Sequence, residues 1–442
     1  MIEPVKLKED LDFLFTTLEQ THPNMYAYTD EAEFGKLKND LYARADRGMD
    51  RKQFYWLLAP VIAALESGHT QVFPPVDELM TSIGAGGKFY ALTLDCISEP
   101  PILKEYAGAS KLAAGGAVLT INGEATAKLI ARYAGCMASE GKASNRPVLA
   151  KMLPLFLWMD YGTDKPLVMR IRGIDGAEGD YSIEPVTMKE ARESRPSKGR
   201  GGVYAYRYLD GYGAAVIEWK SFRDRQRFKE FLTNTFTNIQ DRKASCVIID
   251  LRENAGGDSR LGRDLMDYLY DKPYSEFSRV DLKISPLLRR QQPGFIKVAR
   301  ALLKDREPKN GEIVSIAAGS SPVDEVQPSD NPLRYKGKVY VLIGPKTASS
   351  AVTFASMAKH YGVGTLVGEE TGDTTACYGD SLHFSLPNSK LRVDVACKYF
   401  VNWGSAGDLR GVIPHHEVKQ PPADVAKGLD TLVQYTLGLM RK

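Results

Sequence analysis

Residues 247–251 read VIIDL, a nearly unbroken run of branched apolar side chains. Such a run is typical of a parallel strand that is buried on both faces, because a strand with one wet face alternates polar and apolar residues. A second run, KVYVLI, occupies residues 338–343. Each run leads into a loop and then into a segment with helical character. We therefore predict an α/β domain over residues 199–442, interrupted by an irregular polar insertion at about residues 273–336.

The first part of the chain has a helical pattern. Apolar residues recur at helical spacing in three segments, which predicts a helical domain over residues 1–86. Asp50 and Gln53 form a capping-box pattern at the start of the third helix. Gly68 is placed to cap the end of that helix. His69 is therefore expected directly after a helix end.

Residues 87–198 change character and predict a small α+β module with a linker. The strand-like segments are residues 88–95, 117–121, 167–172 and 181–183, and the helical ones are 125–133 and 148–158. Asn122-Gly123 is a turn signal between them. Residues 194–202 are rich in Ser, Lys, Arg and Gly, which is typical of a linker. With three parts in 442 residues, the chain is predicted to be an α/β multidomain protein.

Composition excludes several classes of protein. The formal net charge is only +3, whereas a nucleic-acid binder should carry a basic excess. The longest apolar run, residues 55–65, is broken by Pro60 and is too short to span a membrane. No signal peptide is visible at the start of this sequence. The five cysteines are scattered, and no H-E-x-x-H pattern occurs, so we expect neither a zinc site nor a cofactor.

The two loops after the buried strands are the candidate functional segments. Gly256 and Gly257 allow backbone N–H groups to approach a ligand, although a tight turn that serves packing explains them equally well. Ser349 and Ser350 stand where a helix begins, and free N–H groups there stabilise the oxyanion that a serine nucleophile creates. A simple helix cap explains these serines as well.

A serine nucleophile needs a base, and the sequence has six histidines. His69 is the strongest candidate, whereas His22 stands beside a proline and reads as a turn residue. His360 lies about 16 Å from Ser349 along the same predicted helix and is too far away. His415 and His416 could bind a metal or face solvent. Neither a G-x-S-x-G elbow nor a P-loop pattern occurs.

Five segments together resemble the serine peptidases of the carboxy-terminal (tail-specific) processing peptidase and tricorn core protease group. They occur in the family's order over nearly the whole chain. The segments are ESGHT at 66–70, VIIDLRENAGG at 247–257, TASSAVTF at 347–354, VGEET at 367–371 and GVIPHHEV at 411–418.

The resemblance implies a Ser–His–acid mechanism. One branch of the family uses a lysine as base. The position of that lysine falls near Thr374 in this sequence, where no lysine stands, so the lysine branch is disfavoured. The tricorn-like branch implies Ser349 as nucleophile, His69 as base and Asp408 as the acid that orients it. Glu369 is the competing or supporting acid.

The resemblance also implies the oxyanion hole and the folds of the domains. The amides of Gly256, Gly257 and Ser350 would bind the oxyanion. Residues 87–198 would form a PDZ-like module, and residues 199–442 a crotonase-like or ClpP-like catalytic domain.

The implied activity is a serine endopeptidase that cleaves unfolded or C-terminal polypeptide segments, without metal or cofactor. Its partner would be a polypeptide and not a nucleic acid. The protein itself would have no integral membrane segment, and its fold would allow oligomerisation. The family's habits place it in the cell envelope or periplasm of a bacterium. Two alternatives stay open, namely a catalytically silent protein that binds peptides or small ligands on the same fold and a crotonase-like acyl-thioester enzyme.

Overall fold

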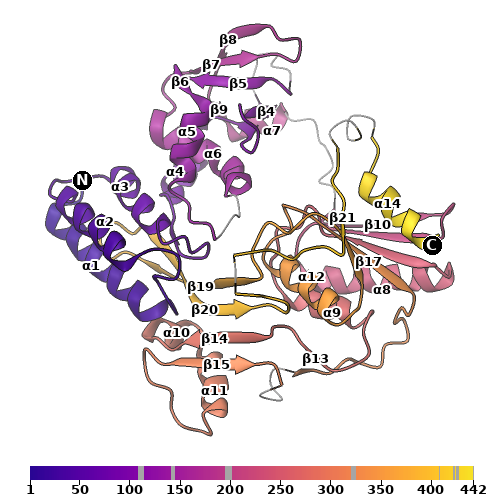
Figure 1. Cartoon of the computed structure of the whole chain (residues 1–442). Coiled ribbons are helices and arrows are strands. Elements are labelled where there is room, and N and C mark those ends of the chain that lie inside the picture. The colour runs from indigo at the N-terminus through magenta and orange to yellow at the C-terminus, as the bar shows by residue number, and fades with distance from the viewer. Residues whose placement is uncertain are drawn as a thin grey trace. The chain divides into compact units, whose positions relative to one another are not determined.

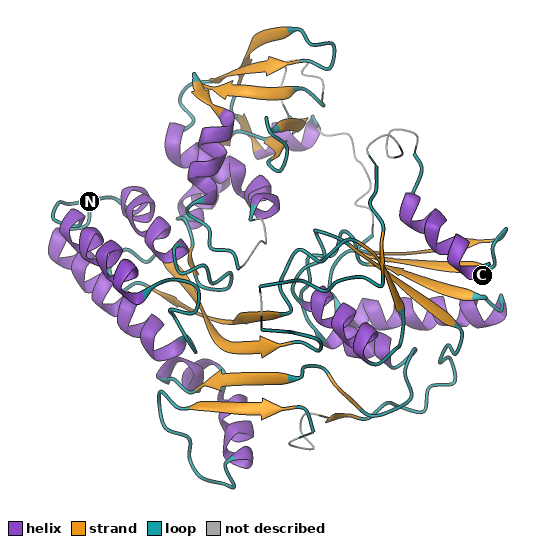
Figure 2. Cartoon of the chain, in the orientation of Figure 1, coloured by secondary structure: helices purple, strands orange, loops and turns teal. Residues whose placement is uncertain are grey.

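The computed structural model of the chain describes residues 1–107, 114–140, 145–194, 202–319, 325–407, 409–421, 424 and 428–441. It divides into two compact units. Unit 1 comprises Met1–Ser139, Ser144–Arg200 and Asp380–Cys397, and unit 2 comprises Glu140–Ala143, Gly201–Gly379 and Lys398–Lys442. Both units contain helices and strands (Figure 2), which confirms the predicted α/β multidomain class. The domain borders at residues 86 and 198 stay predictions. The sequence did not predict that residues 380–397 belong with unit 1.

The three predicted helices at the start of unit 1 are present, as α1 (Pro4–Thr21), α2 (Glu31–Arg44) and α3 (Arg51–Ala63). Asp50 and Gln53 form the predicted capping box of α3, since each side chain accepts the other residue's backbone N–H.

The prediction for the end of α3 was wrong. The helix ends at Ala63 with Ala64 as its cap, because the next amides bond to carbonyls only three residues back. Glu66, with φ 52°, takes the left-handed conformation expected of Gly68. His69 therefore lies in a loop, several residues after the helix end.

The rest of unit 1 is built on a sheet in the order β3-β4-β5-β7-β8, with β6 paired to β5. Asn122 and Gly123 both have positive φ in the tight turn between β5 and β6, as their sequence predicts. The strand β4 and the helix α4 were not predicted. The predicted linker lies almost entirely outside the described residues. The elements are β1 (Gln71–Val72), α4 (Val76–Gly84), β2 (Lys88–Phe89), β3 (Leu92–Asp95), β4 (Ile102–Tyr106), β5 (Ala117–Ile121), β6 (Glu124–Ala125), α5 (Thr126–Ala134), α6 (Arg146–Tyr161), β7 (Leu167–Arg172), β8 (Glu178–Ile183), β9 (Val186–Thr187) and α7 (Met188–Glu193).

Unit 2 contains a six-stranded sheet in the order β10-β11-β12-β17-β18-β21. All neighbours in it are parallel except β10 and β11. The two apolar runs of the sequence form its central neighbours, β12 and β17. The elements of this layer are β10 (Tyr204–Leu209), β11 (Ala214–Trp219), α8 (Arg225–Asp241), β12 (Cys246–Asp250), α9 (Arg260–Met266), β17 (Lys338–Ile343), α12 (Ser350–His360), β18 (Thr365–Gly368), β21 (His416–Glu417) and α14 (Thr431–Met440).

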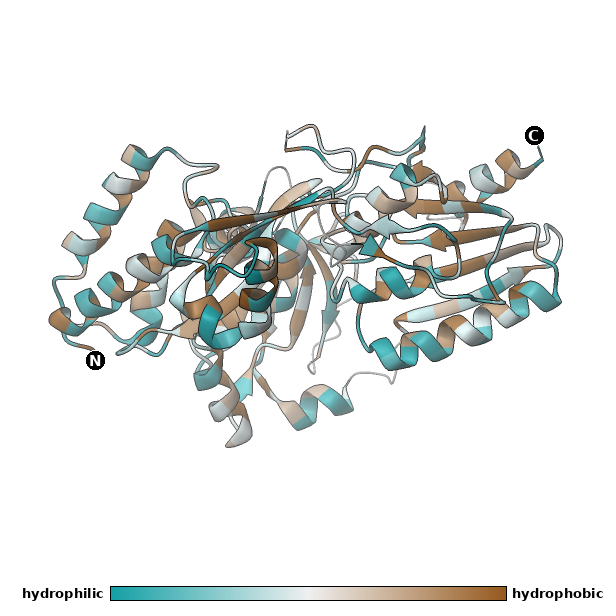
Figure 3. Cartoon of the chain, turned by 90° about the horizontal axis from the view of Figure 1, so that it is seen from below, coloured by the Kyte–Doolittle hydropathy of each residue, from teal (hydrophilic) through white to brown (hydrophobic). Residues whose placement is uncertain are grey.

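The sheet of unit 2 is covered on both faces, as predicted. Val247 and Ile249 of β12 pack into a core with α8, α9 and α12, whereas Ile248 packs into a second core with α14 (Figure 1). In Figure 3 the strands of this sheet, drawn near the chain end marked C, are largely brown, which marks hydrophobic residues. This double burial explains why polar residues are rare in the run. The covering helix α14 was not predicted.

The prediction that residues 273–336 are irregular was wrong. They form β13 (Tyr274–Ser275), β14 (Arg279–Lys283), α10 (Pro286–Gln291), α11 (Pro293–Leu302), β15 (Ile313–Ala317) and β16 (Glu325–Val326). Strand β14 pairs with β15 and with the last residues of β20 (Arg392–Val401). It has a polar composition because charged residues alternate with buried Val280 and Leu282.

Strands β19 (Ala376–Ser385) and β20 carry the chain from unit 2 into unit 1 and back. Among the described residues, no helix has the length and apolar character needed to cross a membrane.

Candidate active site

Two loops meet at the carboxyl edge of the unit 2 sheet, where open α/β sheets bind ligands. The glycine loop, residues 251–257, follows β12, and the serine loop, residues 344–349, follows β17. Because β12 and β17 are parallel neighbours, both loops leave the same edge. The hydroxyl of Thr347 donates to the carbonyl of Leu251 (2.9 Å), and the amide of Ala348 donates to the carbonyl of Asn254 (2.9 Å). The structure therefore brings the predicted serines and glycines together.

Ser349 is half-buried and has a backbone geometry that an ordinary helix cap does not require. Its φ of 52° and ψ of −127° occupy the first central position of a turn closed by the amide of Ala351 and the carbonyl of Ala348. That position favours glycine, so a serine there is strained by about 1–3 kcal/mol. The hydroxyl makes no capping bond to α12. The alternative interpretation of Ser349 as a simple cap is therefore disfavoured.

The neighbouring Ser350 is engaged differently. Its side chain is buried, and its hydroxyl donates to the carbonyl of Gly257 at 2.7 Å. This bond joins the start of α12 to the glycine loop. Ser350 thus has a structural role, whereas the Ser349 hydroxyl makes no capping bond and is available to react.

The two glycines have different reasons for lacking a side chain. A Cβ on Gly256, where φ is +84°, would lie 2.7 Å from the Cβ of Ser349 and 2.9 Å from the amide of Ser350. A Cβ on Gly257 would lie 2.2 Å from the carbonyl oxygen of Phe222. Gly256 therefore lets the two loops approach each other at Ser349, and Gly257 lets its loop pack on Phe222 in the segment after β11.

The amides of this region are not equally free. The amide of Gly256 already donates to the side-chain oxygen of Asn254 at 2.8 Å. In the part of the chain that the structure describes, the amides of Gly257 and Ser350 donate to no protein acceptor. An oxyanion could therefore bind these two amides without breaking an existing bond.

Asn254 is a site residue that sequence reasoning missed. It is fully buried, its side-chain amide donates to the carbonyl of Trp219 (2.8 Å), and its backbone carbonyl accepts the amide of Ala348. It therefore fixes the glycine loop against β11 and the serine loop. The only signal in the sequence is an asparagine two residues before a glycine, which is typical of many turns.

We expect Gly256→Ala to lower the turnover number at least about tenfold, because the new methyl group displaces Ser349, the candidate nucleophile, and misplacement of reacting groups is costly. The matched control is Gly362→Ala, since Gly362 has a similar φ (+66°) but open space around its Cβ position. The control measures backbone strain alone. Equal turnover numbers and melting temperatures in the two variants would show that Gly256 has no special role.

Asp373 is a second residue that the sequence did not predict. Its carboxylate accepts the backbone N–H of Ser349 at 2.7 Å, and its backbone carbonyl accepts the hydroxyl of Thr371. A charged acceptor bonded to the strained residue holds the turn in place. The next residue, Thr374, stands where a lysine base would be expected, and its buried hydroxyl donates to the carbonyl of Ala376.

We expect Asp373→Ala to destabilise the protein by about 1–3 kcal/mol and to lower turnover, because the amide of Ser349 loses its acceptor. Asp373→Asn keeps an acceptor oxygen and should retain more of both. Thermal unfolding and steady-state kinetics on the two variants test this. If the alanine variant turns over as fast as the wild type, the carboxylate is not needed to hold Ser349 in place.

His69 lies in unit 1, in a loop that several hydrogen bonds hold. The amide of Asn24 donates to Nδ1 of His22, so Nε2 of His22 carries the hydrogen and donates to the hydroxyl of Ser67 (2.9 Å). Ser67 in turn donates to Thr70. The carbonyl of His69 accepts the hydroxyl of Ser381 (3.1 Å). His22 is fully buried and supports this loop, so it is more than the predicted turn residue.

Three other histidines have structural contacts. His360 stacks on Trp403, with 3.9 Å between the ring centroids, and burial lowers its pKa. His415 accepts the amide of Leu366 on Nδ1, and His416 contacts the hydroxyl of Tyr435. These contacts explain the three histidines without a metal.

The predicted acids are placed as follows. Glu369 follows β18, and its amide donates to the carbonyl of Ile343 at the carboxyl edge of the sheet. Asp408 lies outside the described residues.

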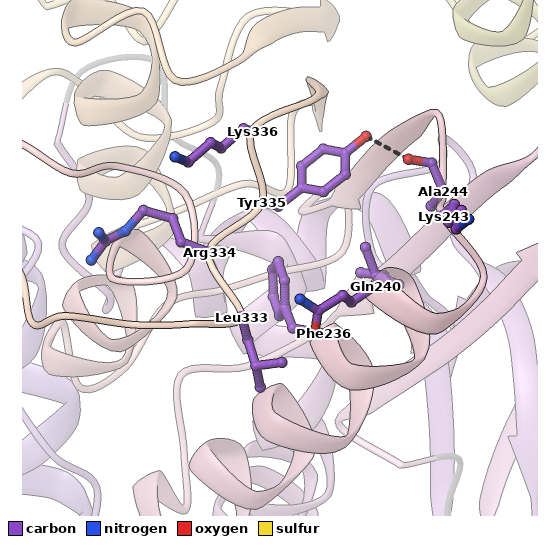
Figure 4. Close-up of a pocket in the computed structure, with 9 residues that line it drawn as sticks. Phe236, Gln240, Lys243, Ala244, Leu333, Arg334, Tyr335 and Lys336 are labelled. Atoms are coloured by element: carbon purple, nitrogen blue, oxygen red, sulfur yellow. Dashed lines mark hydrogen bonds between the residues drawn. The ribbon is translucent and has the colours of Figure 1, made fainter.

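A cavity of about 160 Å³ in unit 2 lies apart from this site (Figure 4). Its wall includes Lys243 and Lys336, which come shortly before β12 and β17, so it lies at the amino edge of the sheet. The hydroxyl of Tyr335 donates across it to the carbonyl of Ala244 (3.0 Å). It contributes nothing to the candidate active site.

The sequence of unit 2 decides the family. Residues 213–418, which contain both loops and β21, match the model of peptidase family S41. Residues 213–418 therefore form a peptidase family S41 segment. The chain is a serine-type peptidase, a hydrolase, as the sequence predicts. This assignment favours the peptidase over the two alternatives that the sequence left open.

Solved structures are similar over nearly the whole chain. Mature CPAF is 14% identical with a TM-score of 0.69, and the match covers 99% of this chain and 98% of that one. Mature CPAF complexed with lactacystin is 13% identical with a TM-score of 0.68, covering 99% of each chain. The photosystem II D1 C-terminal processing protease is 14% identical over 93% of each chain, with a TM-score of 0.47. The two CPAF likenesses concern the fold alone. No curated protein sequence matches the chain.

Proposed function

We propose that this peptidase is a serine endopeptidase that cleaves unfolded or C-terminal polypeptide segments, with Ser349 as its nucleophile. The observation that carries this proposal is the placement of Ser349. Its hydroxyl makes no capping hydrogen bond to α12, and its backbone is strained. It stands beside the amides of Gly257 and Ser350, which donate to no acceptor among the described residues.

The reaction proceeds in two steps, acylation of Ser349 and hydrolysis of the acyl-enzyme. The oxygen of Ser349 attacks the scissile carbonyl, and His69 accepts the hydroxyl proton. The amides of Gly257 and Ser350 bind the oxyanion, and the tetrahedral adduct collapses as the protonated His69 returns its proton to the leaving amine. Water then attacks the acyl-enzyme with His69 again as base, which releases the new carboxyl end and restores Ser349.

The third member of the triad is Asp408 in this proposal. In the described residues, Nδ1 of His69 is buried and makes no hydrogen bond, and an imidazole in that condition needs an acceptor to fix its tautomer. Glu369 is the alternative acid. Asp408→Asn should then lower turnover much more than Glu369→Gln, and the reverse order would exchange their roles.

The finer fold assignments belong to the same proposal. The sheet order β3-β4-β5-β7-β8 in unit 1, together with helices α5, α6 and α7, supports a PDZ-like module in residues 87–198. The mainly parallel sheet of unit 2 supports a crotonase-like or ClpP-like catalytic domain. PDZ domains bind chain ends by strand addition, so such a module would present substrate. A peptide amide and its free-acid form would then bind with different affinities, and equal binding would contradict this role.

We place the enzyme in the cell envelope of a bacterium, as its family resemblance implies, and expect that it can oligomerise. Fractionation of the source cells and light scattering of the purified protein test these two points. Enzyme found only in the cytoplasm would contradict the first, and a monomer at all concentrations the second.

The activity is tested by digesting one protein in two states, native and reduced with alkylated thiols. Mass spectrometry of the products should find internal cleavage of the unfolded form only. Release of single residues from the ends would mean an exopeptidase. No cleavage of either form by the wild type would contradict the proposal.

A further inference from the structure

Arg252 in the glycine loop is held between two carboxylates. One belongs to the nearby Asp250, and the other to Asp430, which is far away in the sequence. Its guanidinium donates to both oxygens of Asp250, at 2.9 and 2.6 Å, and to both oxygens of Asp430, at 3.0 and 2.7 Å. The side chains of Arg252 and Asp250 are only 22% and 15% exposed. Paired, planar contacts of this kind are directional and strong. The arrangement therefore fixes Arg252 in one orientation.

Asp430 is itself fixed, because it begins the helix α14. One of its oxygens accepts the amide of Val433 at 3.1 Å, which makes it the N-cap. The helix is anchored by Leu432 and Leu437, which are buried in the core on its face of the sheet. Asp430 thus presents its carboxylate to Arg252 from a packed element.

The charges of this cluster stabilise one another. Burial by itself would raise the pKa of Asp430, but the hydrogen bonds and charge of Arg252 outweigh it and lower that pKa below its usual range. Burial would likewise lower the pKa of Arg252, but the two carboxylates raise it above its usual value. At neutral pH Arg252 and Asp430 are therefore both ionised.

Arg252 also lies near the second loop of the site. Its Cγ lies 3.9 Å from the position that a Cβ on Gly344 would take, so its stem lies beside the first residue of the serine loop. The amide of Leu251, the residue before it, donates to the carbonyl of Leu342 in β17. Arg252 stands at the base of both loops, four residues before Gly256.

We propose that Arg252 is a positioning residue through which α14 holds the glycine and serine loops in register. This inference rests on the proposed function, because it assumes that these loops carry the nucleophile and the oxyanion amides. It makes the C-terminal helix a support of the active site, although α14 contributes no group to the reaction. Loosening the Arg252–Asp430 contact should therefore misplace the oxyanion amides, which affects the transition state more than the bound substrate.

The test is Asp430→Asn, because asparagine is as good an N-cap as aspartate but removes the charge and one of the two oxygens that accept from Arg252. We expect kcat to fall about tenfold, the order expected of residues that modulate a site without touching its ligand, while KM stays within about twofold. Arg252→Met, which keeps most of the stem, should have a similar effect. The double variant should be no slower than the slower single variant, because both remove the same contact. Arg252→Lys should recover part of kcat.

The matched control is Asp264→Asn. Asp264 forms a comparable paired contact with Arg225 (2.6 and 2.7 Å) between helices α8 and α9 of the same unit. This variant should lower the melting temperature without changing kcat.

A wild-type kcat in Asp430→Asn, or a loss of kcat no larger than in Asp264→Asn, would overturn the inference and leave the proposed function intact. Strictly additive effects in the double variant would also overturn it. Failure of the proposed function would instead be seen in the wild type, as an absence of chemistry at Ser349.

Discussion

Ser349→Ala is expected to abolish peptide hydrolysis while the melting temperature stays within a few degrees of the wild type. Loss of a serine nucleophile lowers turnover by a factor on the order of 10⁴–10⁶. The change removes only a hydroxyl that makes no capping bond, and alanine meets the same backbone strain as serine at this φ. Steady-state hydrolysis of an unfolded protein and thermal unfolding measure the two quantities.

The control for this prediction is Ser350→Ala. It removes the bond from the Ser350 hydroxyl to the carbonyl of Gly257 but leaves the Ser350 amide in place. We expect a moderate loss of stability and turnover, because one hydrogen bond contributes about 1 kcal/mol. Full activity in Ser349→Ala together with inactivity in Ser350→Ala would move the nucleophile by one residue.

The second large effect is expected for His69→Ala. With His69 as general base, kcat/KM of the wild type should rise with pH through one ionisation and then level, since the base must be neutral to accept a proton. The variant should lose this ionisation together with most of the activity, again by a factor on the order of 10⁴–10⁶. The pH profile of kcat/KM in both proteins is the measurement.

Two other histidines serve as controls for that profile. His360→Ala should leave the profile unchanged, because His360 stacks on Trp403 away from the site. His22 accepts the amide of Asn24 and bonds to Ser67 in the His69 loop, so His22→Gln tests whether a change in the profile arises from loosening of that loop. A variant His69→Ala that keeps wild-type turnover and the same acidic limb would mean that another group activates Ser349.

The parts of the site that could be predicted from the sequence are those encoded locally. Burial on both faces is visible in residues 247–251 and 338–343, and parallel neighbours necessarily deliver their loops to one edge. Adjacent glycines and a serine at a helix start mark those loops. Local patterns therefore marked the glycine and serine loops as candidate segments, whereas the choice of Ser349 within its loop came from the family resemblance.

The parts that could not be predicted depend on contacts between distant segments. Asp430 and Asp373 are ordinary charged residues in the sequence, and their roles depend on Arg252 and on the amide of Ser349, which they meet only in the folded chain. Strand β14 was missed because its exposed alternate residues are charged. Helix α3 ends before Gly68 because its last turn tightens to hydrogen bonds between residues three apart. No residue type in that segment indicates this tightening.

The most direct test of the account is the location of the adduct formed by a fluorophosphonate, a reagent that phosphonylates activated serines. The wild-type enzyme would be inactivated, digested with trypsin and analysed by tandem mass spectrometry. The account predicts one phosphonyl group per chain, on Ser349, and loss of labelling in both Ser349→Ala and His69→Ala. An inactivating adduct on any other residue, or an enzyme that hydrolyses peptide and never labels, would contradict it.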